Sequence, residues 1–174
     1  MLNKKSLFNF VYAIALVGAV MSCFGILNEF LNIAQLHGIR IPNTQSFTNQ
    51  GYFEPFFFYL LAFLVSALAV TALLLHLFGI TNVFGKINLN KKTVNIILAS
   101  ACAVLLVMSF VFVFILRYYN EYSNDYRLAY YDYLVYYTFR SGVMSFVANA
   151  GILLGCHLLD AKRKNATEGE QTGE

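Results

Sequence analysis

The side chains that could carry out chemistry in this chain are few, and most stand within or beside long apolar stretches. His76, His157 and Asp160 lie near the ends of such stretches, and imidazole and carboxylate groups are common metal ligands and acid–base groups. A zinc site needs three or four clustered ligands, whereas these histidines belong to different apolar segments and lack a clustered third ligand. We therefore expect no metal site and no cofactor, and we interpret both histidines as hydrogen-bonded residues at the segment boundaries.

The three cysteines, Cys23, Cys102 and Cys156, all fall within apolar runs. They form no CxxC pair, and none stands in a polar loop where a structural disulfide could form. We expect them to pack as small apolar side chains. One alternative remains open, because residues 20–23 (VMSC) follow two lysines and an apolar run and loosely resemble a bacterial lipoprotein cleavage site, which would make Cys23 a lipidated N-terminus.

A catalytic function finds little support in the sequence. Four acidic residues of the polar connections could serve an enzyme at the outer surface, namely Glu29, Glu54, Asp125 and Asp132. No spacing singles them out, and the chain has no GxSxG, HExxH or phosphate-binding loop motif. We name no catalytic residue and favour a non-enzymatic protein. The formal charge of +3 is scattered, which excludes the basic patch of a nucleic-acid-binding protein.

Tyrosine is the one residue type with a distinctive distribution, because nine of the twelve tyrosines lie between Tyr118 and Arg140 in a chain without tryptophan. At about 100° per residue, eight of these nine fall within one third of a helix circumference. The pattern favours a short Tyr-rich helix at the outer membrane boundary. A hairpin strand is the alternative, because residues 128–137 partly satisfy a period of two.

A phenol joins an apolar ring to a hydrogen-bonding tip, so tyrosines suit both the membrane–water boundary and recognition surfaces. The segment is either an aromatic belt or a platform for a partner, lipid or ligand. Arginines on both sides of it can extend to lipid phosphates or capture an anionic ligand. The residues expected to make such contacts are Tyr118, Tyr122, Tyr126, Tyr130, Tyr133, Tyr137, Arg117 and Arg140.

Apolar segments must position all of these residues. Hydrophobic residues make up 59% of the 174 residues and charged residues only 12%, whereas soluble domains carry about 25% charged residues. Backbone groups in lipid must satisfy their own hydrogen bonds, so each apolar segment should be a helix. The sequence predicts an all-α polytopic membrane protein with one four-helix transmembrane domain over 1–161 and a disordered tail over 162–174. Its predicted spans, each long enough to cross a bilayer, are residues 7–27, 55–80, 93–116 and 141–159.

The basic residues predict the orientation of the spans. They precede the first span, fill the connection between the second and third, and follow the fourth: Lys4, Lys5, Lys86, Lys91, Lys92, Lys162, Arg163 and Lys164. Lysine and arginine concentrate in cytoplasmic segments. We therefore expect a multi-pass protein of the plasma membrane with both termini cytoplasmic, and the residue usage favours a bacterial source.

Small residues in the fourth span indicate close helix packing. Gly151 and Gly155 form a GxxxG motif, with Ser145 and Asn149 on nearby turns. The motif serves packing within the bundle or contact with another subunit, including a second copy of the chain. Gly18 with Ser22 forms a weaker pair of the same kind.

The functional hypothesis is a non-enzymatic accessory protein whose outer loops and Tyr-rich face contact a partner, a lipid or a ligand. A subunit of an oligomeric transporter or channel, lined by serine, threonine and Asn149, is the alternative. A membrane enzyme with an outer-face acid comes third.

Overall fold

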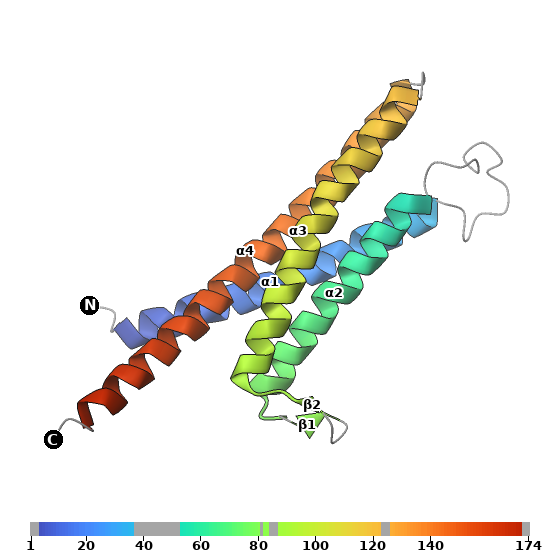
Figure 1. Ribbon diagram of the computed structural model, residues 1–174. Helices are drawn as coiled ribbons and strands as arrows, with labels where there is room; N and C mark the ends of the chain where they lie inside the picture. The colour runs from blue at the N-terminus through green and yellow to red at the C-terminus, as the bar shows by residue number, and fades with distance from the viewer. Residues whose placement is uncertain (1–3, 37–52, 81, 84–86, 123–125, 172–174) are drawn as a thin grey trace.

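The computed structural model describes residues 4–36, 53–80, 82–83, 87–122 and 126–171, and it describes side chains for most of the apolar segments among them. It consists of α1 (Lys4–Leu36), α2 (Phe53–Leu77), α3 (Lys91–Tyr122) and α4 (Tyr126–Gln171), with a small antiparallel pair, β1 (Asn82–Val83) and β2 (Ile87–Asn88), between α2 and α3 (Figure 1).

Each helix contains a stretch long and apolar enough to cross a membrane: Ser6–Asn32, Phe57–Leu77, Lys91–Phe114 and Tyr137–Lys162. These stretches overlap the four predicted spans, so the prediction of four membrane-length helices is confirmed. The protein therefore has the architecture of a multi-pass membrane protein.

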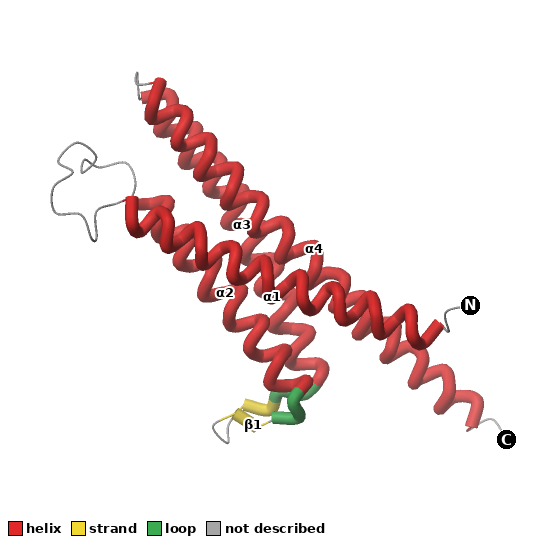
Figure 2. Tube along the Cα trace, turned by 180° about the vertical axis from the view of Figure 1, so that it is seen from behind, coloured by secondary structure: helices red, strands yellow, loops and turns green. Residues whose placement is uncertain are grey.

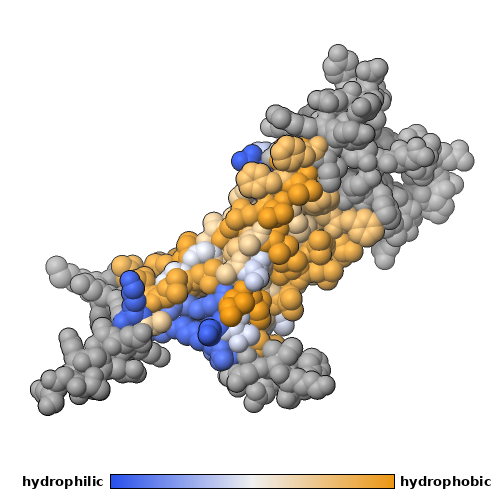
Figure 3. Space-filling model, viewed as in Figure 1, coloured by the Kyte–Doolittle hydropathy of each residue, from blue (hydrophilic) through white to orange (hydrophobic). Residues whose placement is uncertain are grey.

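Buried residues recur at alternating spacings of three and four along the helices, which is the heptad pattern of left-handed helix packing. Buried positions in α2, α3 and α4 follow this pattern, while α1 contributes small residues such as Ala15 and Ala19. The opposite faces expose large apolar side chains, including Met21, Leu68 and Phe110, as a lipid-facing surface requires (Figure 3). The heptad positions are Tyr59, Ala62, Ser66, Ala69 and Leu73 in α2, Val94, Leu98, Ala101, Leu105, Met108 and Phe112 in α3, and Phe139, Val143, Phe146, Ala150, Leu153 and His157 in α4.

The helices pack in a ring, α1 on α2, α2 on α3, α3 on α4 and α4 on α1. Figures 1 and 2 show that the ring opens at both ends. Towards the N-terminus and the β1–β2 pair, α1 and α4 diverge together from α2 and α3. At the opposite end, α3 and α4 continue as a long antiparallel hairpin that separates from α1 and α2.

The expected short interfacial helix between the third and fourth spans is not supported. Instead α3 continues from its span through Tyr122, and α4 begins at Tyr126 and enters the fourth span without a break. No glycine or proline lies between Gly85 and Gly142, so the sequence contains no helix-breaking residue at the span boundaries. The tyrosine segment is helical in its described residues, which rules out the alternative hairpin strand over residues 128–137.

The last helix also extends past the predicted end of the fourth span. α4 has 46 residues and ends at Gln171, so residues 162–171 are helical where the composition predicts a disordered tail. Side chains beyond Lys162 lie outside the described set. At Cys23, where a lipoprotein cleavage site was the alternative, α1 is continuous, and the thiol accepts a 3.5 Å hydrogen bond from Ser66 of α2.

Candidate functional site

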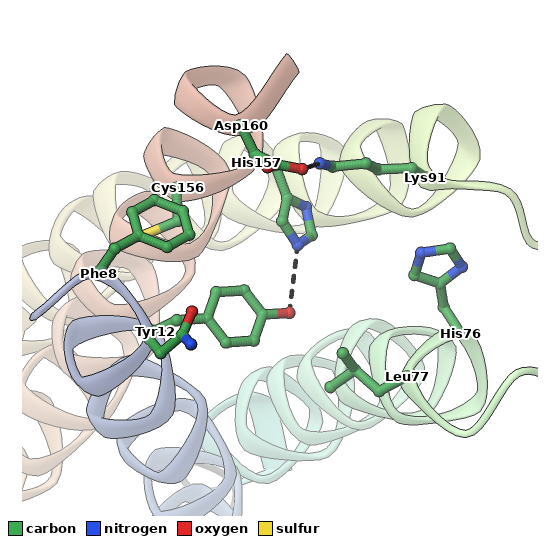
Figure 4. A pocket seen from close by; sticks show the side chains of 9 residues that line it. Phe8, Tyr12, His76, Leu77, Lys91, Cys156, His157 and Asp160 are labelled. Carbon is green, nitrogen blue, oxygen red and sulfur yellow. Dashed lines mark hydrogen bonds and ion pairs between the residues drawn. The ribbon is translucent and has the colours of Figure 1, made fainter. Parts of the chain in front are cut away.

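A polar pocket lies where α1 and α4 diverge from α2 and α3. It has a volume of ≈ 280 Å³ and receives side chains from all four helices (Figure 4). Its lining residues are Phe8, Asn9 and Tyr12 of α1, His76 and Leu77 of α2, Lys91 of α3, and Cys156, His157 and Asp160 of α4. Each of these residues lies within about two turns of the end of a predicted span or just beyond it, where a membrane boundary is expected.

His157 lines this pocket and links α4 to α1 and α3. Its side chain is 7% exposed, its Nδ1 lies 2.5 Å from Oδ1 of Asn95, and its Nε2 lies 3.2 Å from the hydroxyl of Tyr12. An amide oxygen can only accept, so Nδ1 carries the proton and donates to Asn95. Nε2 then accepts from the Tyr12 hydroxyl, whose ring also stacks on the imidazole at a centroid distance of 5.6 Å. The arrangement holds a neutral histidine between α1, α3 and α4.

An ion pair and a second histidine form the polar sides of the pocket. Nζ of Lys91 lies 2.5 Å from Oδ2 of Asp160, and the two side chains are 36% and 40% exposed. Nδ1 of His76 donates to the carbonyl of Leu89 at 2.7 Å, which leaves Nε2 as an acceptor in the neutral ring. Figure 4 shows the His76 ring across the pocket from Tyr12.

Both histidines are hydrogen-bonded residues near the span ends, in agreement with the expectation from the sequence, and the structure places them in one pocket with Tyr12 and Lys91. The sequence predicts no site role for Tyr12, Lys91 or Asn95, the partner of His157. In the sequence, these residues are distinguished only because they are polar and lie within two turns of a span end. Over the described residues, no three His, Cys, Asp or Glu side chains gather in a way that could hold a metal ion.

A second polar cluster joins α1 to α4 near the middle of the bundle. The Ser22 hydroxyl donates to the Gly18 carbonyl at 2.7 Å and lies 2.8 Å from the Ser145 hydroxyl, which therefore donates to it. Nδ2 of Asn149 donates to the Ser145 carbonyl at 2.8 Å. A Cβ atom added to Gly18 would lie 2.3 Å from Oδ1 of Asn149, so the two helices approach closely here.

The GxxxG motif of the fourth span lies elsewhere. A Cβ atom added to Gly151 or to Gly155 would meet nothing within 4 Å, and Gly151 is exposed. The predicted packing residues therefore divide: Ser145 and Asn149 lie against α1, whereas the two glycines make no close contact with a described neighbour.

The tyrosine segment forms the far part of the α3–α4 hairpin. Tyr137 is 61% exposed and Arg140 is also exposed. α3 ends at Tyr122 and α4 begins at Tyr126, which divides the segment between two helices, so the single short Tyr-rich helix predicted by the sequence is not supported. The side chains of the other predicted contact residues lie outside the described set: Arg117, Tyr118, Tyr122, Tyr126, Tyr130 and Tyr133.

The chain matches no protein-family model, and neither the curated proteins nor the solved structures include a significant match to it.

Proposed function

We propose that this chain is a non-enzymatic interaction protein of a bacterial plasma membrane and that its α3–α4 hairpin contacts a protein partner outside the bilayer. The observation that carries the proposal is the length of this hairpin. The apolar sequence of the third predicted span ends at Leu116 and that of the fourth begins at Ser141, yet α3 continues to Tyr122 and α4 starts at Tyr126. At about 1.5 Å per residue, the helices extend beyond these predicted spans by roughly 9 and 22 Å.

The composition of this extension supports a recognition role. Tyrosine and arginine are enriched at protein–protein interfaces, where a rigid aromatic ring buries apolar area and its hydroxyl still finds a hydrogen-bond partner. An aromatic belt at the membrane boundary needs only rings at one depth. Tyrosines spread from Tyr118 to Tyr137 along two extended helices cover more depth than such a belt requires.

The distribution of basic residues supports an outward-facing hairpin. All the lysines lie at the end of the bundle opposite the hairpin, where they begin α1, accompany the β1–β2 connection and α3, and follow the fourth predicted span. Lysine-rich ends stay in the cytoplasm. Both termini are then cytoplasmic, and the hairpin projects from the outer surface.

Photocrosslinking in cells tests the proposal. A photoreactive residue replaces Tyr126 at the hairpin tip or the exposed Tyr137 at its base, and a matched control replaces Leu68, which is 67% exposed on the lipid-facing side of α2. We expect a discrete protein adduct from the two hairpin positions and lipid adducts only from position 68. Lipid adducts alone at all three positions, with no stoichiometric partner after purification in mild detergent, would contradict the proposal.

A further inference from the structure

We propose that the pocket between Tyr12, His76, Lys91 and Asp160 binds the headgroup of a phospholipid that carries a phosphodiester and a primary ammonium. This site lies at the end of the bundle opposite the α3–α4 hairpin, and the inference is independent of the proposed partner contact.

The position of the pocket favours a lipid over a solute from either aqueous phase. Its lining residues come from the first turns of α1 and α3, the last turns of α2, and the end of the fourth apolar segment in α4, where lipid headgroups are expected. Leu77 in the lining and Phe78 beside it are 44% and 78% exposed. The pocket therefore adjoins lipid-facing apolar surface along which acyl chains can lie while the headgroup enters.

The size of the pocket suits a headgroup rather than a whole lipid. Its ≈ 280 Å³ is close to the lower bound of about 300 Å³ for small-molecule pockets. It would hold roughly nine water molecules at about 30 Å³ each. A phosphate with a two-carbon amine is of this size, whereas diacyl chains must remain outside, against the apolar surface of the helices.

The polar groups select the charge pattern of the ligand. Lys91 and Asp160 place one cation and one anion side by side, and both remain partly exposed. A phosphodiester can pair with Lys91 while an ammonium pairs with Asp160, so a zwitterionic ligand matches the pair without leaving a charge uncompensated.

The acceptors in the pocket select a primary ammonium. Nε2 of His76 is an acceptor because Nδ1 donates to the Leu89 carbonyl. The Tyr12 oxygen keeps acceptor capacity because its proton is directed to His157. With the Asp160 carboxylate, these groups offer three acceptors to three N–H donors. A trimethylammonium headgroup has no N–H donor to use them.

Native mass spectrometry of the full chain in detergent tests this inference, with added lipids of identical acyl chains and different headgroups. We expect phosphatidylethanolamine to bind about tenfold more tightly than phosphatidylcholine or phosphatidylglycerol, which corresponds to about 1.4 kcal/mol. Asp160→Asn should reduce this preference to less than about twofold, and Lys91→Gln should weaken binding. Lys92→Gln, at the exposed neighbouring lysine, is the matched control and should leave binding unchanged.

Three outcomes overturn the inference: equal binding of the three lipids, an unchanged preference in Asp160→Asn, or equal losses in Lys91→Gln and Lys92→Gln. Soluble glycerophosphoethanolamine distinguishes the source of the ligand, because binding as tight as that of the diacyl lipid would identify a solute site instead. If Asp160→Asn fails to fold by thermal melting, the double variant with Lys91→Gln and Asp160→Asn replaces the ion pair with neutral amides. The same loss of preference is then required.

Discussion

Gly18 is the position at which one added methyl group should disturb the bundle most directly. A Cβ atom there would lie 2.3 Å from Oδ1 and 2.6 Å from Cγ of Asn149, so the whole amide would have to move. Moving it would break the 2.8 Å bond from Nδ2 to the Ser145 carbonyl. We expect Gly18→Ala to lower the free energy of unfolding by about 1–3 kcal/mol, as overpacking of a close contact does.

Unfolding of the detergent-solubilised protein measures this effect, with Gly151→Ala as the control. The added Cβ of that variant meets nothing within 4 Å, so we expect no destabilisation and a gain of up to about 1 kcal/mol from the higher helical propensity of alanine. Combining Gly18→Ala with Asn149→Ala should recover part of the loss, because the double variant removes the clashing amide. Equal destabilisation by Gly18→Ala and Gly151→Ala would contradict the α1–α4 packing.

The contact between Gly18 and Asn149 also shows that the sequence does not reveal which of two small-residue motifs makes the closer helix contact. Gly151 and Gly155 form the stronger sequence motif, yet α1 and α4 approach each other closely at the weaker pair, Gly18 and Ser22. Helical spacing places two small residues on the same face, but it does not say towards which neighbour that face turns. The facing direction depends on Asn149 and Ser145, which lie more than 120 residues away along the chain.

At the scale of whole elements, the sequence predicts helices better than it predicts where they end. The membrane-length stretches follow from hydropathy, because burial of an apolar segment in lipid depends on that segment alone. The membrane boundary, however, does not end a helix whose residues retain helical propensity in water. For this reason α3 and α4 pass through the expected boundary, and the predicted separate helix is absent from the described residues.

A proline within the α4 extension tests the function of the continuous hairpin. Ala129 is the fourth residue of α4 and precedes the predicted fourth span, which begins at Ser141. Ala129→Pro removes a backbone donor and disfavours helical conformation in the preceding residues, so it should unwind the first turn of α4, which carries Tyr126. We expect the protein adduct from a photoreactive residue at Tyr126 to disappear, while the melting temperature of the transmembrane bundle changes little.

Ala129→Leu is the matched substitution, because it preserves helical propensity and should preserve the adduct. Retention of the adduct in Ala129→Pro would show that the partner does not require the extended helix. Loss of the adduct together with unfolding of the bundle would show that the extension is part of the folding unit instead.

At the scale of the whole molecule, the polar pocket is the feature that the sequence predicts least. Tyr12, Asn95 and His157 meet only because α1, α3 and α4 converge at that end of the bundle. None of these residues carries a spacing signal towards the others, since they come from three separate spans. The helices pair differently at the two ends: α1 and α4 diverge from α2 and α3 at the pocket, whereas α3 and α4 separate from α1 and α2 at the other end (Figure 1).

The orientation of the molecule in the membrane determines on which side the pocket and the α3–α4 hairpin lie. Fusion of a cytoplasm-active reporter after Glu174, or insertion of it at residues 84–86, should give activity, because the lysines near these points favour the cytoplasmic side. Insertion at residues 123–125 should be active only with a reporter that works outside the cell. The charge rule also predicts that paired lysines added at 123–125 reduce the fraction of correctly oriented chains, whereas paired glutamines at the same site do not. Activity of the reporter after Glu174 on the outer side alone would reverse the orientation, place the hairpin in the cytoplasm and require its partner to be a cytoplasmic protein.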